Sequence, residues 1–586
     1  MIFSACLLSL LGATSPVSTG PVQDRTGSAP RVYSAELDEE QSAWVEKTLA
    51  GLSVREMAGQ LMMDWTPGGY AAIESDQFDR SVRNVEGGVG GLWVMGGLPY
   101  TRAAKINELQ ARAKVPLLVM TSGDLGKRQM ALPRVGGGTD VPSALALSAA
   151  GEATFVREAA RIIGQEARGT GSNMISDNGS VNLLKDLANV LGNRTFGDDA
   201  QQAARLIEAF IEGADEAGVI SHIGFFPGFG NMSVDPHVAL PIDRTDRKGF
   251  ETEHFVPFRA AIRAGAECFM TSHFAVPALT GSETLPVTLS PEITRILREE
   301  LGFDGLLITD AMAMGGITNT YEAIDAAVLA FKAGNDLILG TWSNRAADKI
   351  TELVESGELS LEQLRTSVRR ILTVKAKLGL HKYTLVDLNA INKVVGRREN
   401  QIVMDAAADR SIVLLRDEKE LVPFSSDLNV LSITLEHLVN WEAGNGFNSQ
   451  LSEGVDQFDT ERVSPLTRSS VFDGLLKRAE NADRVVLSVY IRPQLGVDQY
   501  TEMSDEFLKF VHDLRAAGRD VVVISFGKLT LLDDLPEIGT LMMAWSEQDV
   551  MQRAAARALL GMTPISGKLP LNLPPFHKRG DGLTRE

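Results

Sequence analysis

The sequence predicts an α/β protein with a (β/α) barrel followed by a smaller, open α/β domain. From about residue 40 to 380, short apolar runs alternate with amphipathic helical stretches. The runs are apolar throughout, which is typical of parallel strands that are buried on both faces. A stretch of different rhythm at residues 381–405 then leads into a second series of strands.

The first region contains strands and helices in alternation. The predicted strands are residues 90–97, 115–122, 266–274, 305–312 and 335–340. The predicted helices include residues 152–169, 199–218 and 291–302. This repeat over about 340 residues favours a barrel, in which functional side chains gather at the carboxyl ends of the strands.

The second region begins at residues 411–424. Its further predicted strands are residues 430–434, 484–491, 520–527 and 540–546, and they are followed by a helix at 552–561. About 180 residues favour an open sheet over a second barrel.

Composition excludes several classes of function. The chain has 586 residues, more than one hydrophobic core usually supports, and its 44% hydrophobic and 23% charged residues are ordinary for a globular protein. A net charge of −19 argues against nucleic acid as a partner. Cys6 and Cys268 are too few for a disulfide framework, and neither lies in a metal-binding pattern, so we expect Cys268 to be a core residue.

The N-terminus predicts export. Residues 1–20 hold about eleven mostly apolar residues followed by small and polar ones, the size of a signal-peptide core and too short to span a bilayer. The usual basic residues before the apolar run are missing. The expected location is periplasmic or extracellular, with no stable membrane span.

Polar residues at the predicted strand ends are the candidate site. They are Asp124, His273 and Asp310, and each follows an apolar strand. Asp310 is the strongest, because its small neighbour Ala311 leaves room for a carboxylate at the barrel mouth to attack an anomeric carbon. In the loop GFFPGFGNMSVDPH (224–237), Asp235 could orient His237 for proton transfer. Alternatively, each strand-end residue could cap a helix or bind backbone, and the Asp235/His237 spacing could be a coincidence.

The chain resembles glycoside hydrolase family 3, in particular its bacterial β-N-acetylglucosaminidase (β-hexosaminidase) branch. The matching stretches include GNRTFGDDA (192–200), PGFGNMSVDPHVALP (227–241), MTSHFAVPAL (270–279), the run from LPVTLSPEITRILREELG to FDGLLITDAMAMGGI (285–317) and AGNDLILG (333–340). The far end, AAARALLGMTPISGKLPLNLP (554–574), resembles the second domain of that family.

The resemblance implies an architecture. It implies a (β/α)8 TIM-like barrel at residues 40–385, a linker at 386–408 and a C-terminal α/β sandwich domain at 409–586, after the signal segment at 1–20. It also implies a retaining glycosidase that needs no cofactor or metal and acts on a carbohydrate, such as amino-sugar oligosaccharides or cell-wall fragments. The oligomeric state stays open.

The resemblance also assigns roles to residues. Asp310 matches the nucleophile, and His237 with Asp235 matches the acid/base pair. Asp124, Arg194 and His273 are the expected substrate-binding residues.

Departures from the family pattern concern the sugar-binding loop. The family has a lysine and a histidine where this chain has Gly224 and Phe225, and a second histidine where it has Phe229. Replacement donors could come from Lys127, Arg128 or His222, although each could equally be a surface residue.

From the resemblance as a whole, we expect removal of terminal β-linked N-acetylglucosamine from glycans by double displacement. The alternatives are a glycosidase of other sugar specificity, such as a β-glucosidase, and a catalytically weak glycan-binding homologue.

Overall fold

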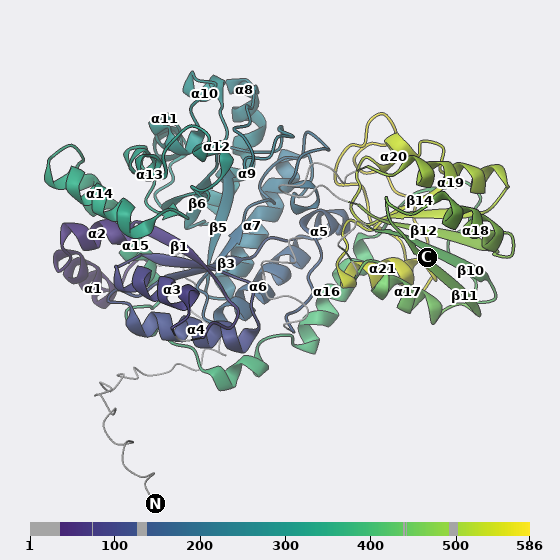
Figure 1. The fold of residues 1–586 in the computed structure, drawn as a ribbon, viewed down its shortest axis with the longest axis horizontal. Helices are drawn as coiled ribbons and strands as arrows, with labels where there is room; N and C mark the ends of the chain where they lie inside the picture. Colours follow the sequence, from purple (N-terminus) through teal and green to yellow (C-terminus); the bar gives the residue numbers. More distant parts are fainter. Residues whose placement is uncertain (1–35, 73, 126–136, 437–439, 441, 492–501) are drawn as a thin grey trace, which may run out of the picture.

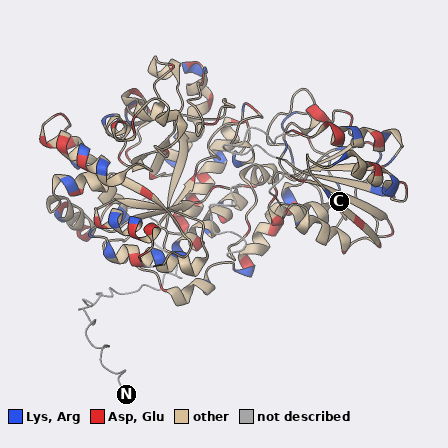
Figure 2. Ribbon diagram, viewed as in Figure 1, with Lys and Arg blue, Asp and Glu red and all other residues tan. Residues whose placement is uncertain are grey.

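The computed structural model describes residues 36–72, 74–125, 137–436, 440, 442–491 and 502–586. Figure 1 shows two lobes, with the first sheet surrounded by helices in one lobe and the second sheet in the other. In the ribbon of Figure 2, the lysine, arginine, aspartate and glutamate positions lie mainly on the helices and loops around the two sheets. Within the described ranges, no helix is long and apolar enough to cross a membrane.

The first sheet is a parallel barrel. Its strands are β1 (Met62–Pro67), β2 (Gly91–Met95), β3 (Leu118–Ser122), β4 (Met174–Asp177), β5 (Ile220–Phe226), β6 (Cys268–Thr271), β7 (Leu306–Thr309) and β8 (Ile338–Leu339). The strand order β7-β6-β5-β4-β3-β2-β1-β8 follows the chain, and a parallel bridge between Ile308 and Leu337 joins β7 to the start of β8. The expected α/β barrel is confirmed.

Helices surround this barrel and bury their apolar sides against it. They are α1 (Glu39–Ala50), α2 (Val54–Gln60), α3 (Asp76–Glu86), α4 (Pro99–Arg112), α5 (Ala144–Ala150), α6 (Ala153–Gly169), α7 (Ala200–Glu216), α8 (Arg247–Gly249), α9 (Phe255–Arg263), α10 (Pro277–Thr280), α11 (Pro291–Arg295), α12 (Gly315–Thr318), α13 (Ala323–Lys332), α14 (Ser343–Glu355) and α15 (Leu361–Lys377). Shorter helical turns are η2 (Gly192–Arg194), η3 (Phe250–His254), η4 (Val287–Leu289), η5 (Ile296–Glu300) and η6 (Leu388–Lys393). Many of these helices begin at a side-chain cap; at α7, for example, the Asp199 carboxylate accepts from the backbone N–H of Gln202.

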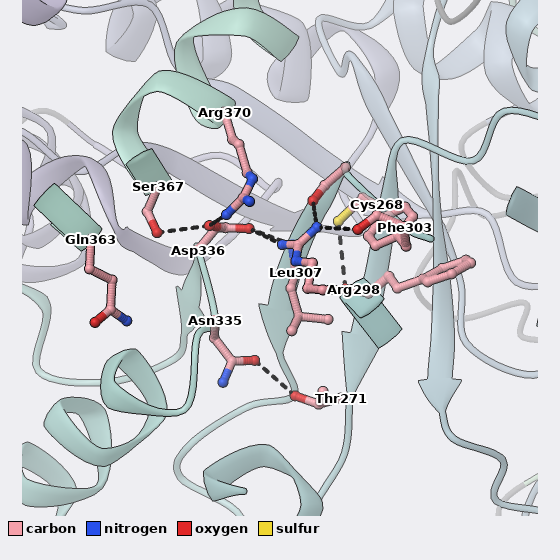
Figure 3. A network of polar contacts seen from close by, with 12 residues as sticks. Cys268, Thr271, Arg298, Phe303, Leu307, Asn335, Asp336, Gln363, Ser367 and Arg370 are labelled. Carbon is pink, nitrogen blue, oxygen red and sulfur yellow. Dashed lines mark hydrogen bonds and ion pairs between the residues drawn. The ribbon is translucent and has the colours of Figure 1, made fainter. Parts of the chain in front are cut away.

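A buried polar network fixes the closure of the barrel (Figure 3). The Asp336 side chain, just before β8, is fully buried and accepts hydrogen bonds from Arg298 at 2.8 Å, Ser367 at 2.8 Å and Arg370 at 3.2 Å. It also accepts the backbone N–H of Leu307 in β7 at 3.0 Å. The carboxylate therefore joins β7, β8 and two surrounding helices, and these charged partners compensate for its burial.

The second sheet is mixed. Its strands are β9 (Val413–Asp417), β10 (Asn429–Glu436), β11 (Gln457–Val463), β12 (Arg484–Tyr490), β13 (Val521–Ser525) and β14 (Thr540–Met543), in the order β11-β10-β12-β13-β14-β9. Only β9 runs antiparallel to its neighbour. The helices of this lobe are α17 (Asn445–Ser452), α18 (Ser469–Ala479), α19 (Asp505–Ala516), α20 (Leu531–Asp534) and α21 (Asp549–Leu559).

The two lobes are joined by α16 (Arg398–Ser411), which packs against α5 and α6 on one side and α21 on the other. The stretch expected to be a linker, 386–408, thus contains η6 and most of a packed helix. Side chains also bridge the lobes: Gln548 donates to the carbonyl of Val141 at 2.5 Å, and Asn193 donates to that of Trp545 at 3.0 Å.

Several elements were absent from the sequence-based expectation. It missed β1, β4, β5 and β11, and it made the other barrel strands too long. β1, β4 and β11 carry charged residues, and Ser221 and His222 interrupt β5, so none of these strands forms a continuous apolar run in the sequence. Cys268 is a buried free cysteine in β6, as expected.

Candidate active site

A cavity of about 220 Å³ lies at the carboxyl ends of the barrel strands. Its lining side chains come from or follow β1, β2, β4, β5, β7 and β8, together with the segment before η2. The lining residues are Trp65, Trp93, Met95, Asn178, Val190, Leu191, Arg194, Phe225, Phe229, Pro236, His237, Asp310, Ala311, Met314, Leu339 and Gly340. The cavity thus brings together Asp310, His237 and Arg194, which are far apart in the sequence.

Asp310 follows directly after β7. Its Oδ2 accepts a hydrogen bond from the Ser272 hydroxyl at 2.8 Å, and its Oδ1 accepts the backbone N–H of Ala311 at 2.8 Å. Its own N–H donates to the carbonyl of Thr271 at 2.8 Å, which ties the residue to the end of β6. Both carboxylate oxygens therefore have hydrogen-bond donors that hold the side chain in place.

His237 and Asp235 form a pair on the loop after β5. The Nδ1 of His237 lies 2.7 Å from Oδ1 of Asp235, and the His237 backbone N–H donates to the same oxygen at 2.9 Å. Asp235 is buried, whereas the His237 side chain is 47% exposed. A carboxylate at Nδ1 fixes that nitrogen as the protonated one, so Nε2 is left to exchange a proton with a ligand in the cavity.

Two glycines after β7 let this loop approach the Asp310 strand end. The backbone N–H groups of Gly315 and Gly316 donate to the carbonyls of His237 at 3.0 Å and Pro236 at 2.9 Å. A Cβ on Gly315 would come within 2.5 Å of the Val238 carbonyl oxygen and 2.7 Å of that of His237. The sequence AMGGI is therefore needed where the His237 loop rests on the segment that follows Asp310.

A second polar cluster lies at the ends of β3 and β4. Arg194 donates to Oδ2 of Asp124 at 3.1 Å, and both side chains are buried. The other oxygen of Asp124 accepts the backbone N–H of Asn178 at 2.5 Å. Burial and the nearby Asp124 charge raise the pKa of Asp177 to about 6.

This cluster orients Arg194 and Asn178, which line the cavity, whereas Asp124, which was expected to bind substrate, is not among the lining residues. The carbonyl of Trp545 in the second lobe accepts from Asn193, next to Arg194. The second lobe therefore braces the segment that carries the arginine.

His273 lies outside the set of lining residues. It is fully buried; its Nε2 lies 3.0 Å from the carbonyl oxygen of Ala311 and its Nδ1 lies 3.0 Å from the hydroxyl of Thr288. Burial lowers its pKa, which favours the neutral ring. This placement favours a role in positioning the backbone beside Asp310 over the expected contact with substrate.

The apolar first half of the loop enters the cavity. Phe225 and Phe229 are both lining residues, with ring centroids 5.7 Å apart in an edge-to-face arrangement. Gly224 packs closely, since a Cβ there would lie 3.2 Å from Asn178 Oδ1 and from Met270. The substitutions at these positions therefore give the cavity an apolar wall.

Three residues were suggested as replacement hydrogen-bond donors for the sugar, and the structure describes one of them. Lys127 and Arg128 lie outside the described residues. His222 is fully buried on β5, in register with Ser176 of β4, and the surface interpretation of this histidine is wrong. Burial lowers its pKa to about 4, so the ring is neutral.

Sequence reasoning missed Ser272, Asn178 and the two tryptophans of the cavity. Ser272 could have been found, because it follows β6 directly and precedes His273. Trp65 and Trp93 are paired across β1 and β2, but β1 had not been recognised.

Comparisons with known proteins agree with this geometry. The Glycosyl hydrolase family 3 N terminal domain matches residues 93–374. A β-N-acetylglucosaminidase/β-glucosidase of Cellulomonas fimi is 26% identical over 570 residues, which are 92% of this chain and 96% of that protein. The β-hexosaminidase LpqI of Mycobacterium tuberculosis is 30% identical over 276 residues, which are 44% of this chain and 68% of that protein.

A solved structure, a glycoside hydrolase family 3 β-N-acetylglucosaminidase from Paenibacillus sp., is 28% identical. It superposes with a TM-score of 0.78 and the match covers 89% of this chain and 99% of that one. The barrel is that of a glycoside hydrolase. The chain belongs to glycosyl hydrolase family 3.

Proposed function

We propose that the protein is a retaining β-N-acetylglucosaminidase that removes terminal β-linked N-acetylglucosamine from glycans. The observation that carries the proposal is the contact of 2.7 Å between His237 Nδ1 and Asp235, which leaves Nε2 open in the cavity that also holds Asp310. The names of the Cellulomonas, Mycobacterium and Paenibacillus relatives support the sugar.

In the first step, a carboxylate oxygen of Asp310 attacks the anomeric carbon of the terminal sugar. The bond to the leaving oxygen breaks, and His237 gives that oxygen the proton on Nε2, so that an alcohol departs. The Ser272 hydroxyl and the Ala311 N–H hold the Asp310 carboxylate in place for the attack. The product is a glycosyl ester on Asp310, and His237 is left neutral.

In the second step, a water molecule attacks the same carbon. Neutral His237 takes a proton from the water at Nε2, and the ester bond to Asp310 breaks. Asp235 stabilises the imidazolium that forms, since its carboxylate faces Nδ1. Two inversions return the sugar in its original β configuration, and both catalytic groups regain their starting charge.

Two further polar side chains line the cavity and could bind the terminal sugar. Arg194 offers a cation and Asn178 an amide, and Asp124 holds the Arg194 side chain and the Asn178 backbone in place. We assign the sugar hydroxyls to these two residues because the rest of the lining is mostly apolar.

The test uses the 4-nitrophenyl β-glycosides of N-acetylglucosamine and glucose. The purified protein should release nitrophenol from the N-acetylglucosaminide, whereas Asp310→Asn should lose this activity by at least about 10³-fold. Folding of each variant is checked by circular dichroism. Hydrolysis of neither glycoside by a folded parent protein would refute a glycosidase acting on these sugars.

β-Glucosidase specificity is the second candidate, and the double name of the Cellulomonas relative supports it. A higher kcat/KM for the glucoside than for the N-acetylglucosaminide would favour it. We also propose export to the periplasm or medium, on the apolar stretch in residues 1–20, with amino-sugar oligosaccharides or cell-wall fragments as substrates. Cell fractionation tests this, and recovery of the protein only from the cytoplasm would refute it.

A further inference from the structure

A buried tryptophan of the second lobe has an unusual backbone conformation. Trp545 follows β14, its side chain is fully buried, and its φ is +66°. Among the residues that the structure describes, the other non-glycine residues with positive φ are Glu74 and Glu420, and both are exposed. A bulky residue avoids this region because its Cβ crowds the backbone, so the conformation persists only where the surroundings hold it.

Two hydrogen bonds hold Trp545, and they go to different parts of the chain. The indole Nε1 donates to the carbonyl of Ser411, the last residue of α16, at 2.7 Å. The carbonyl of Trp545 accepts the side-chain amide of Asn193, in η2 of the barrel lobe, at 3.0 Å. The side chain is thus anchored on the helix that joins the lobes, while the backbone is turned toward the barrel. Trp545 therefore connects α16 to η2.

Asn193 is the neighbour of the cavity-lining Arg194. Both side chains are buried, and they belong to the same turn of three residues. The guanidinium of Arg194 donates to Asp124 at 3.1 Å, whereas its buried Nε has no hydrogen-bond partner among the described residues. A side chain that is held at one end depends on its backbone for its position. The bond between Asn193 and Trp545 fixes that backbone from the second lobe.

The second lobe also holds the chain just after Arg194. Asp198 accepts the backbone N–H of Asn572 at 3.0 Å and pairs with Arg579 at 2.8 Å. A Cβ on Gly197 would come within 2.2 Å of the carbonyl oxygen of Pro570, so the two backbones are in direct contact. The residues on both sides of the arginine are therefore fixed by the second lobe.

We propose that Trp545 is a positioning residue for the terminal sugar, because its carbonyl holds Asn193 and thereby sets the place of Arg194 in the cavity. This inference rests on the proposed function, in which Arg194 binds hydroxyl groups of the sugar. Strained backbone is concentrated at positions whose conformation serves a functional site. The described lining residues of the cavity all belong to the first lobe, so the second lobe acts on the sugar indirectly.

A second route leads from the same segment to the catalytic histidine. The side-chain amide of Asn189 donates to the carbonyls of Phe229 at 2.8 Å and Met232 at 2.5 Å, on the loop that carries His237. The two routes predict different kinetics. A displaced His237 would impair alkyl glycosides more than 2,4-dinitrophenyl glycosides, because only the alkyl leaving group needs a proton. A displaced Arg194 would impair both equally, because the terminal sugar is the same.

The test measures kcat/KM of Asn193→Ala, Arg194→Ala and the double variant for the 2,4-dinitrophenyl and an alkyl β-N-acetylglucosaminide. Asn193→Ala should lower kcat/KM by about tenfold on both substrates. In the Arg194→Ala background the same change should cost less than about twofold, because the arginine through which it acts is gone. Asn107→Ala is the matched control: it removes an asparagine bond to a carbonyl, that of Val386, outside the cavity lining and should keep the parental kcat/KM.

Trp545→Phe gives a second comparison, since it keeps a buried ring and removes the N–H that bonds to Ser411. It should lower kcat/KM on both substrates and add nothing in the Arg194→Ala background, and it decides the outcome if Asn193→Ala does not fold. Parental kcat/KM in these variants, equal losses with and without Arg194, or a greater loss on the alkyl glycoside would overturn the positioning role and leave the proposed function intact. If the parent hydrolysed no N-acetylglucosaminide, the proposed function would fail and the positioning role with it.

Discussion

Gly315→Ala should impair catalysis by moving the His237 loop. The new Cβ would lie 2.5 Å from the Val238 carbonyl oxygen and 2.7 Å from that of His237. Relaxed carbon–oxygen contacts lie at roughly 3.3–3.6 Å, so the loop has to move by about 0.8–1.1 Å to relieve the closer contact. A displacement of about 1 Å at a catalytic group can cost on the order of 10²-fold in rate, and we expect kcat/KM to fall by about 10–100-fold.

The assay is kcat/KM for two β-N-acetylglucosaminides, one with a 2,4-dinitrophenyl and one with an alkyl leaving group. The loss should be greater for the alkyl glycoside, because only that leaving group needs a proton from His237. Gly474→Ala in α18 is the control, since a Cβ there meets nothing within 4 Å. Parental activity of a folded Gly315→Ala protein on both substrates would refute the positioning of His237 by this close approach.

Three further predictions concern charge. Asp235→Asn should lower kcat on alkyl glycosides by about 10²–10⁴-fold and on dinitrophenyl glycosides much less; equal losses on both would contradict the acid role of its partner. The pKa of His222 is about 4 in the folded protein and about 6.5 in the unfolded chain, so the unfolded chain takes up the proton first as the pH falls. The free energy of unfolding should therefore decrease by roughly 3 kcal/mol between pH 6.5 and pH 4. Urea unfolding at pH 7 and pH 4 should therefore show a greater decrease in the free energy of unfolding for the parent than for His222→Leu, and equal decreases would disprove this. Asp336→Ala should lower the free energy of unfolding by about 3 kcal/mol, because it leaves Arg298 without its buried partner. Glu46→Gln is the control: it breaks an exposed ion pair with Arg369 and should cost under about 1 kcal/mol. Similar losses of stability in both variants would contradict a stabilising role of the Asp336 network.

The fold could be predicted because its strands are apolar and regularly spaced with helices. The barrel strands that escaped prediction lack a continuous apolar run: Asp64 interrupts β1, Ser176 and Asp177 end β4, and Ser221 and His222 interrupt β5. Once β1 was missed, the pairing of Trp65 with Trp93 could not be foreseen, because register depends on which strands are neighbours.

Some residues of the candidate site could be predicted from the sequence and others could not. Asp310, His237 and Asp235 could be named because a carboxylate at a strand end and an Asp-x-His loop are visible in the sequence. The supporting contacts could not be, since they depend on distant backbone: Ser272 reaches Asp310 from β6, and Gly315 meets the His237 loop. His273 shows the limit of strand-end reasoning, because it has the expected position in the chain but lies outside the cavity lining.

The most direct test of the central claim is to trap the sugar on Asp310. In His237→Ala, a 2,4-dinitrophenyl β-N-acetylglucosaminide can still form the glycosyl ester without acid assistance, but the ester reacts slowly with water for want of a base. Acid quenching and peptide mapping by mass spectrometry should then find one N-acetylglucosaminyl group on the peptide that contains Asp310. A label on a different residue, or turnover without any covalent adduct, would contradict the account.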